Sequence, residues 1–319
     1  MHQSLKVSEK SKIDYISRIN RVMDYIETHL DQPLGLEKLA DLACFSKFHF
    51  HRIFQGLTGE CLSECISRIR IEKAATLLLD NPNKSITEIA LHCGFASSAS
   101  FANTFRKHFN KSPSQYRMHT KPGIKERYIY MSKEDLNKIH IQIDYQNGKQ
   151  AFYLEGKDYK RQVDVFNLPE WRLAYIRYTG PYKGDSRLFA SLWKKLMTWA
   201  CPRGILEKPD NVYLVIYHDN PEITEEDKLR VSVCVSIDKD MQVSGEVGKL
   251  YLPGGKYAVC RFILGEKDYS AAWGWVYGTW LPLSGYEPDD RPAFEWYPPA
   301  EKKSKDKIPV DICIPVKII

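Results

Sequence analysis

With 319 residues, 43% of them hydrophobic and 27% charged, the chain has the composition of a globular protein and the length of two domains. It contains no run of eighteen uncharged apolar residues and its first twelve residues are polar, so we expect no membrane span, no signal peptide and a cytoplasmic location. The eight cysteines form no C-x-x-C pair, which argues against a disulfide framework or metal site and favours reduced thiols in the core.

Charge and aromatic residues are segregated along the chain. Residues 1–125 hold 18 Lys and Arg against 12 Asp and Glu, a difference of +6, whereas residues 126–319 hold 28 of each. All seven tryptophans and sixteen of the nineteen tyrosines lie after residue 125. The first part is therefore suited to a polyanion and the second to an aromatic binding surface.

The N-terminal part begins with a helical pattern. Apolar residues recur at steps of three and four across residues 13–30, which predicts one amphipathic helix that ends at Asp31-Gln32-Pro33. A shorter helix is expected over 36–43, followed by a turn at Cys44-Phe45 and a helix with Ser46 as its N-cap.

The same helix pair returns about fifty residues later. Leu39-Ala40-x-x-Ala43-Cys44-Phe45 aligns with Ile89-Ala90-x-x-Cys93-Gly94-Phe95, and Ser85-x-x-Glu88 is a capping box that opens the second copy. A long helix over about 61–79 links the copies. Two short helices joined by a tight turn are typical of a helix-turn-helix, so the sequence predicts two such units.

The second helix of each copy has an outward face suited to DNA. An ordinary helical domain with a solvated basic face is the competing interpretation, and the registered repeat argues against it. Arginine matches guanine with two hydrogen bonds, while the small, weakly polar residues of the second copy favour phosphate contacts. The candidate DNA-binding residues are Lys47, Phe48, His51, Arg52 and Gln55 in the first copy and Ser98, Ala99, Asn103, Arg106 and Lys107 in the second.

The region 15–119 resembles the AraC family of bacterial transcription regulators. The resemblance is carried by Ser85-Ile-Thr-Glu-Ile-Ala-Leu-His-Cys-Gly-Phe, by Ser100-Phe-Ala-Asn-Thr-Phe-Arg-Lys-His-Phe and by Ser112-Pro-Ser-Gln-Tyr-Arg117. It implies that both second helices enter the major groove. It further implies base-reading roles for Phe48, His51 and Arg52, and for Ser98, Ala99 and Asn103 in the second copy. The sequence departs from the family pattern at Leu62, Asn103 and Asn110.

The C-terminal part contains an internal repeat of mixed strands and helices. A polar, Lys-rich connection is expected over 121–160, with a strand at Ile139–Tyr145. Strand patterns dominate from residue 161, interrupted by helical stretches near 185–200 and 268–281. Leu168-Pro169 matches Leu252-Pro253 at an offset of 84, and each half runs strand, strand, helix, strand. Two such halves predict a pseudo-twofold domain with a cleft between them.

Glu295 lies among aromatic residues on a predicted strand, in Ala293-Phe-Glu-Trp-Tyr297. A carboxylate in an aromatic cleft is placed to hold a cationic, lipophilic ligand; the alternative is a glutamate on a solvent-facing edge strand. The aromatic stripe Trp273, Tyr277 and Trp280 is explained by core packing or by a ligand cage.

Residues 161–319 resemble the GyrI-like effector-binding domain. The carrying segments are Leu168-Pro, Ile176 to Tyr182, Leu252 to Ala258, Phe294-Glu-Trp-Tyr297 and Asp311-Ile-Cys-Ile-Pro315. The resemblance implies an amphipathic, often cationic effector with Glu295 as its charge partner. The aromatic residues expected to line the site are Tyr178, Tyr182, Tyr213, Trp275 and Tyr297.

The sequence thus predicts a multidomain protein: an all-α double helix-turn-helix domain (1–120), a linker (121–160) and an α+β effector-binding domain (161–319). The leading hypothesis is a transcription regulator of double-stranded DNA that responds to a small molecule and contacts RNA polymerase, with no cofactor and no catalytic residues. The alternatives are a DNA-targeted enzyme that hydrolyses small electrophiles, with Glu295 beside Tyr297 as base, and a protein-binding module like stand-alone relatives that act on topoisomerase.

Overall fold

A computed structural model of the chain describes residues 2–81, 83–119, 139–144, 149–154, 161–208, 210–281, 284–298 and 307–318. The chain divides into two compact units. Unit 1 takes in residues 1–120 and two later segments, Asp219–Glu225 and Asp240–Leu250; unit 2 takes in the remainder. Each unit is described by itself below.

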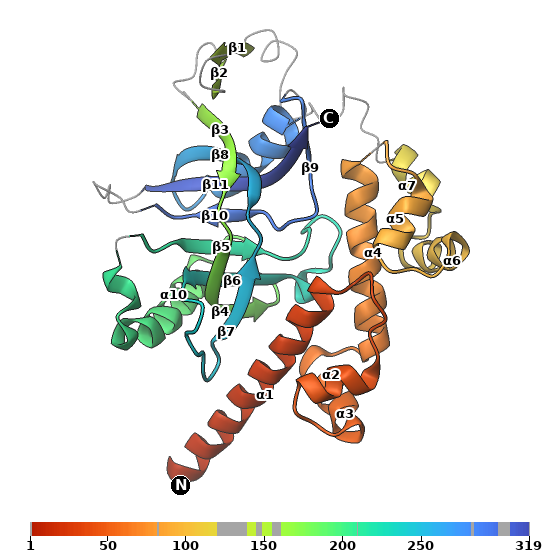
Figure 1. Ribbon diagram of the computed structural model, residues 1–319, viewed down its shortest axis with the longest axis vertical. Helices are drawn as coiled ribbons and strands as arrows, with labels where there is room; N and C mark the ends of the chain where they lie inside the picture. Colours follow the sequence, from red (N-terminus) through yellow and green to blue (C-terminus); the bar gives the residue numbers. More distant parts are fainter. Residues whose placement is uncertain are drawn as a thin grey trace. The chain divides into compact units, whose positions relative to one another are not determined.

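Unit 1 is built from helices, as the apolar spacing predicts (Figure 1). They are α1 (His2–Thr28), α2 (Leu36–Leu42), α3 (Lys47–Thr58), α4 (Leu62–Asp80), α5 (Ile86–His92), α6 (Ser98–Phe109) and α7 (Pro113–His119). The pairs α2–α3 and α5–α6 are the two helix-turn-helix units, and α4 runs from one pair to the other.

Helix α4 belongs to both cores of unit 1. Its first half places Cys65, Ile66 and Ile69 in the cluster around α1, α2 and α3. Its second half places residues such as Ala74 and Leu78 in the cluster around α5 and α6. Because one helix supplies side chains to both cores, a shift of α4 is felt by both helix-turn-helix units.

Side chains cap several helix ends by hydrogen-bonding backbone N–H groups. The predicted capping box is confirmed: Glu88 Oε2 accepts from the Ser85 N–H at 2.8 Å and Ser85 Oγ accepts from the Glu88 N–H at 3.1 Å. Ser46 is the N-cap residue of α3, as expected, but its hydroxyl makes no capping hydrogen bond. Helix α7 was not predicted, although Ser112 and Gln115 form a second reciprocal cap before it.

The equivalent turns of the two pairs carry different residues at their left-handed position. Gly94 has φ of +79°, and a Cβ there would collide with the Leu30 carbonyl oxygen. Cys44 occupies the same place in the first pair with φ of 54°, and its carbonyl oxygen accepts from Arg18 Nη1 at 3.1 Å. A left-handed conformation is strained for any residue with a Cβ, so the second turn requires glycine and the first tolerates cysteine.

Unit 2 is an antiparallel sheet with helices, in the α+β class that the sequence predicts. Its strands are β1 (Ile139–Asp144), β2 (Lys149–Leu154), β3 (Arg161–Leu168), β4 (Trp171–Thr179), β5 (Tyr213–Tyr217), β6 (Arg230–Ser236), β7 (Gly248–Leu252), β8 (Gly255–Leu264), β9 (Tyr286–Pro288), β10 (Phe294–Trp296) and β11 (Ile308–Ile318). The first part of β7, up to Leu250, falls in the Asp240–Leu250 segment of unit 1 and continues into the sheet. Its helical segments are α10 (Ser186–Ala200), α11 (Tyr269–Trp275), the short 3₁₀ turns η1 (Cys201–Arg203), η2 (Ile205–Glu207) and η3 (Glu226–Lys228), and the π-helical turn η4 (Val276–Trp280).

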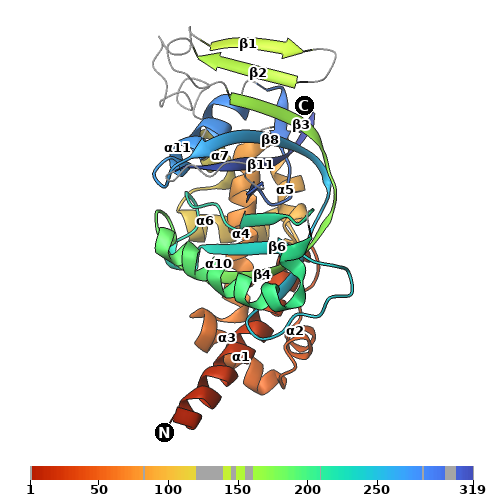
Figure 2. The same ribbon diagram turned by 90° about the vertical axis from the view of Figure 1, so that its left-hand side faces the viewer.

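The strand order shows the predicted duplication. From β3 onward the order is β3-β8-β11-β10-β5-β6-β4-β7, and β5 pairs with β10 at the centre. The offset of 84 residues relates β3 to β7 and β4 to β8, and an offset of about 80 relates β6 to β11 and β5 to β10, so the order is the same read from either end. Each half therefore places its first strand beside strands of the other half; Figure 2 shows β3 running alongside β8.

The helices of unit 2 cover the sheet. Leu192, Leu196 and Ala200 of α10 are buried, and the helix contacts β4 and β6. Trp275, Val276 and Trp280 pack with the inward side chains of β8 and β11. Within the expected connection 121–160, β1 agrees with the strand expected at Ile139–Tyr145 and pairs with β2, which pairs with β3. The remainder of that connection lies outside the described residues.

Candidate DNA-binding surface and effector site

Helix α3 presents a basic face. Phe50 and Phe54 are fully buried against α1 and α4, which leaves the opposite side of the helix to solvent. Lys47, His51, Arg52 and Gln55 are exposed, as the helical projection predicts; the Phe48 side chain lies outside the described ones. Lys47 Nζ lies 3.3 Å from Glu37 Oε1 of α2, an exposed pair that contributes little stability.

Helix α6 presents a smaller and less polar tip. Ser97 caps it by accepting from the Ser100 N–H at 3.1 Å, while Phe101 and Phe105 turn into the core. Ser98 is half-buried and donates to Thr87 Oγ1 of α5 at 3.0 Å. The exposed predicted residues are Ala99, Asn103, Arg106 and Lys107. Arg106 and Lys107 stand in the last turn, where the helix dipole favours positive charge.

Glu295 is the central feature of the candidate effector site. It lies on β10, opposite Val215 of β5, and only 1% of it is exposed. Its Oε1 accepts from Trp273 Nε1 at 2.7 Å and its Oε2 from the Tyr297 hydroxyl at 2.6 Å. The Tyr217 hydroxyl also hydrogen-bonds it. Among the described residues no cationic side chain contacts this carboxyl group.

Aromatic rings surround the carboxyl group from both halves of the repeat. Trp273 lies edge-on to Tyr217, with centroids 5.5 Å apart, and stacks on Tyr277 at 6.0 Å. Tyr182 lies 5.7 Å from Tyr217. In a second set of rings, Trp193 lies 6.4 Å from Tyr213 and 6.1 Å from Tyr297. The site therefore combines one buried acidic group with two sets of aromatic rings.

Burial dominates the electrostatics of this cluster. Desolvation raises the pKa of Glu295 above its ordinary value, and the hydrogen bonds from Tyr297, Trp273 and Tyr217 oppose it only in part. Burial, followed by the charge of Glu295, raises the pKa of Tyr217 and of Tyr297 well above that of a free phenol. The tyrosines thus remain hydrogen-bond donors at neutral pH.

The structure brings most of the predicted effector residues together. Glu295, Tyr297, Tyr213 and Tyr182 belong to the cluster through the contacts above. Trp275 lies in the core instead, edge-on to Phe262 at 5.9 Å, and is 9% exposed. Tyr178 is half-buried on β4, where its hydroxyl approaches Gly180.

Trp273 and Tyr217 were not among the predicted site residues, although they donate to Glu295. The helical stripe Trp273, Tyr277 and Trp280 was the available signal. The first two residues of the stripe border the site, whereas Trp280 is fully buried in the core.

Within the described parts of the chain, none of the helices has the length and hydropathy needed to cross a bilayer, and no three or more His, Cys, Asp or Glu side chains are grouped to hold a metal ion. The eight cysteines are free thiols; Cys65, Cys93, Cys234, Cys260 and Cys313 are buried, whereas Cys44 and Cys201 are exposed.

Two helix-turn-helix units and a duplicated domain around a buried acidic group define a DNA-binding regulator with a small-molecule-binding domain. Family models agree: a helix-turn-helix domain matches residues 39–119 and a GyrI-like small molecule binding domain matches residues 161–317. The chain belongs to the AraC-type transcription regulators that carry a GyrI-like domain.

Two of the relatives that match are named as transcriptional regulators. The chain is 35% identical over 202 residues to an uncharacterised HTH-type transcriptional regulator, YbfP of Bacillus subtilis, covering 57% of this chain and 68% of that protein. It is 35% identical over 105 residues to the transcriptional regulator Rob of Salmonella typhimurium, covering 33% of this chain and 36% of Rob.

Among the solved structures that are similar to the helical part is a transcriptional regulator with an AraC-type DNA-binding domain from Chromobacterium violaceum. It is 30% identical, with a TM-score of 0.31 and coverage of 33% of this chain and 95% of that one.

Proposed function

We propose that this regulator responds to a small amphipathic cation that binds at Glu295. Ligand binding changes the affinity of α3 and α6 for an operator, or the contact of the bound regulator with RNA polymerase. The outward residues of α3 and α6 are the DNA-contacting groups in this proposal. Arg52 reads bases, and Arg106 and Lys107 bind phosphates.

One observation carries the choice of ligand. Glu295 is a buried carboxyl group whose partners among the described residues are all neutral donors. A buried charge without a counter-charge is unfavourable. An organic cation would supply the counter-charge for the Glu295 carboxylate that the protein does not supply itself. The rings of Trp273, Tyr217 and Tyr297 add cation–π attraction and apolar contact.

Access to Glu295 requires a rearrangement, because the group is 1% exposed. Trp273 and Tyr297 each hold one carboxyl oxygen and stand over it. We infer that the cation displaces one of these side chains on entry. The rings remain available as walls of the enlarged site.

The test compares tetraphenylphosphonium with tetraphenylborate, two ions of the same shape and opposite charge, by titration calorimetry on the full chain. We expect tetraphenylphosphonium to bind at least about tenfold more tightly. Glu295→Gln should remove about tenfold or more of that affinity, whereas Glu266→Gln, at an exposed loop position, should leave it unchanged.

The affinity for tetraphenylphosphonium should also rise with pH, since the cation binds the ionised form of a carboxyl group whose pKa is raised. Equal binding of the two ions, or unchanged binding by Glu295→Gln, would contradict the proposed ligand class.

A further inference from the structure

The connection between β5 and β6 has an unusual location. Residues Asp219–Glu225 join two neighbouring strands of unit 2, yet they belong to unit 1. Ile223 packs against the second core of unit 1, among residues of α4, α5 and α6. Thr224 is 5% exposed. The segment is thus anchored by both an apolar and a polar side chain.

Charged groups of the same segment act on α6 and α7. Burial raises the pKa of Tyr116 on α7, and the carboxylate of Glu222 raises it further. Burial and Arg68 lower the pKa of His108 on α6, and Glu225 opposes that shift. These interactions agree with the packing of Ile223, because they place the segment beside the second helix-turn-helix unit.

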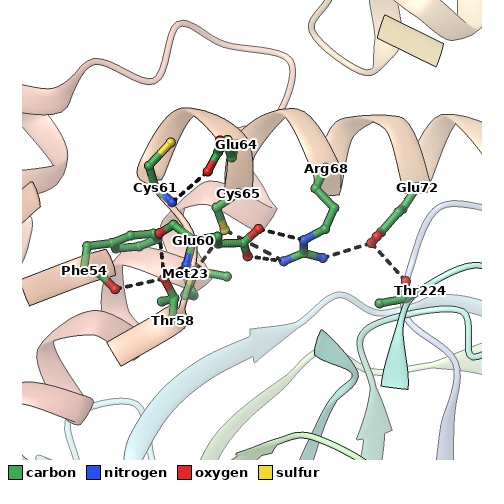
Figure 3. Close-up of polar contacts among 10 residues, drawn as sticks. All are labelled: Met23, Phe54, Thr58, Glu60, Cys61, Glu64, Cys65, Arg68, Glu72 and Thr224. Atoms are coloured by element: carbon green, nitrogen blue, oxygen red, sulfur yellow. Dashed lines mark hydrogen bonds and ion pairs between the residues drawn. The ribbon is translucent and has the colours of Figure 1, made fainter. Parts of the chain in front are cut away.

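Thr224 begins a chain of hydrogen bonds along α4, shown in Figure 3. Its hydroxyl donates to Glu72 Oε2 at 2.9 Å, and Arg68 Nη1 donates to the same oxygen at 3.0 Å. Arg68 then binds Glu60 with two further bonds, Nε to Oε2 at 3.0 Å and Nη2 to Oε1 at 2.6 Å. Glu60 lies between the end of α3 and the start of α4. The contacts therefore extend from Thr224 to the end of the first recognition helix.

The charged side chains in this row of hydrogen bonds are largely shielded from water. The side chains of Glu60, Arg68 and Glu72 are 13%, 11% and 8% exposed. Burial lowers the pKa of Arg68, but the hydrogen bond to Glu60 and the charges of Glu72 and Glu60 outweigh it, so the pKa is raised. Two carboxylates share one guanidinium, and the Thr224 hydroxyl supplies one more donor. Partly buried ion pairs tolerate the loss of a partner poorly, so the arrangement is sensitive to where Thr224 lies.

The other end of the segment leads to the candidate effector site. Tyr217, the last residue of β5, hydrogen-bonds Glu295 through its hydroxyl. Only His218 separates Tyr217 from Asp219, where the segment begins. A ligand that moves the Tyr217 side chain therefore acts two residues from the segment that holds Thr224.

We propose that Asp219–Glu225 is the coupling segment through which the effector controls DNA binding. Occupation of the Glu295 site repositions Tyr217. This movement alters the hydrogen bond from Thr224 to Glu72, and Arg68 and Glu60 transmit the change to α3. The proposal rests on the proposed function, since it assumes an effector at Glu295. It assigns a positioning role to Thr224. In this proposal Thr224 itself contacts neither the DNA nor the effector.

The experiment measures coupling in the full chain. A duplex selected from a random-sequence library serves as DNA, and its Kd is measured by fluorescence anisotropy with and without saturating tetraphenylphosphonium. The ratio of the two Kd values should be at least about fivefold in the wild type and in Thr224→Ser, which keeps the hydroxyl. In Thr224→Val the ratio should fall below about twofold, while the Kd for tetraphenylphosphonium without DNA stays the same. A full ratio in Thr224→Val overturns the proposal.

A second arm needs no ligand. Tyr217→Phe and Thr224→Val are combined in a double-mutant cycle with DNA affinity as the readout. We expect the double variant to differ at least about threefold from the product of the single effects; independent effects overturn the coupling role. If tetraphenylphosphonium does not bind the wild type, the proposed ligand class fails, and this cycle still decides the coupling proposal.

Discussion

At the scale of single residues, Glu295 is the most informative group in the molecule. Its carboxyl group is buried, its partners are neutral, and its pKa is raised by desolvation. In the folded chain the proton is held more tightly than in the unfolded chain. Between the ordinary pKa of 4.5 and the raised one, the native state therefore binds more protons than the unfolded state.

This difference fixes the sign of a pH effect. The contribution of Glu295 to the free energy of unfolding falls as pH rises through that interval, because ionisation of the buried group opposes folding. We expect Glu295→Gln, which does not ionise, to become more stable relative to the wild type as pH increases from about 4.5 towards neutrality. Urea unfolding at several pH values measures this.

The same substitution at the exposed Glu266 controls for the general loss of a carboxyl group. A stability difference between Glu295→Gln and the wild type that does not vary with pH would show that Glu295 is ionised equally in both states.

At this scale, Glu295 and Tyr297 were among the residues that the sequence predicts for the effector site, but Trp273 was not. A strand alternates strictly, so Phe294-Glu-Trp-Tyr297 fixes which side chains share a face. Trp273 and Trp275 lie two residues apart in the α-helical α11 and so point to different faces, but their spacing does not say which of the two faces meets the site. The π-helical η4 begins only at Val276 and alters the angular position of Trp280, which packs in the core although the stripe groups it with Trp273 and Tyr277.

At the scale of elements, α4 determines how the two helix-turn-helix units are joined. Its apolar residues enter two cores, and Arg68 binds Glu60 and Glu72 beside them. The helix itself was predictable from apolar spacing. The pair of Arg68 with Glu72 follows from their i,i+4 spacing, but the pair of Arg68 with Glu60 was not predictable, because it depends on the turn after α3 that brings Glu60 back onto the helix.

Removal of the guanidinium alone should be costly. We expect Arg68→Met to lower the free energy of unfolding by about 3–5 kcal/mol, because two partly buried carboxylates lose their cation. The triple change Arg68→Met, Glu60→Gln and Glu72→Gln should recover most of this loss, since no uncompensated charge remains. Chemical denaturation of the three chains makes the comparison, and a triple variant as unstable as the single one would contradict the assignment.

At the scale of the whole molecule, the net charge lies in the part that contains the two helix-turn-helix units: residues 1–125 carry the entire formal net charge of +6. Binding to DNA should therefore weaken as salt increases, through the release of counterions from phosphates. The exposed basic residues of α3 and α6 should contribute to this dependence in different ways.

Arg52 and Lys107 provide the comparison. We expect Arg52→Ala to cost about 1–3 kcal/mol on the selected duplex and little on random DNA. Lys107→Ala should weaken binding to both and reduce the salt slope by about 1. Anisotropy titrations over a range of salt concentrations measure both effects. If Arg52→Ala lost the same binding free energy on both DNAs, the base-reading role proposed for Arg52 would be contradicted.

The palindromic strand order has a consequence for how unit 2 assembles. Because β3 pairs with β8 of the second half, and its counterpart β7 lies beside β4 of the first, neither half completes its own sheet. A fragment that ends before β7 would keep β3 paired with β2 but without β8 on its other side, and would leave the edge of β4 open. Two such fragments can exchange these edges, so we expect a single half, produced alone, to form a symmetric dimer that imitates the intact domain.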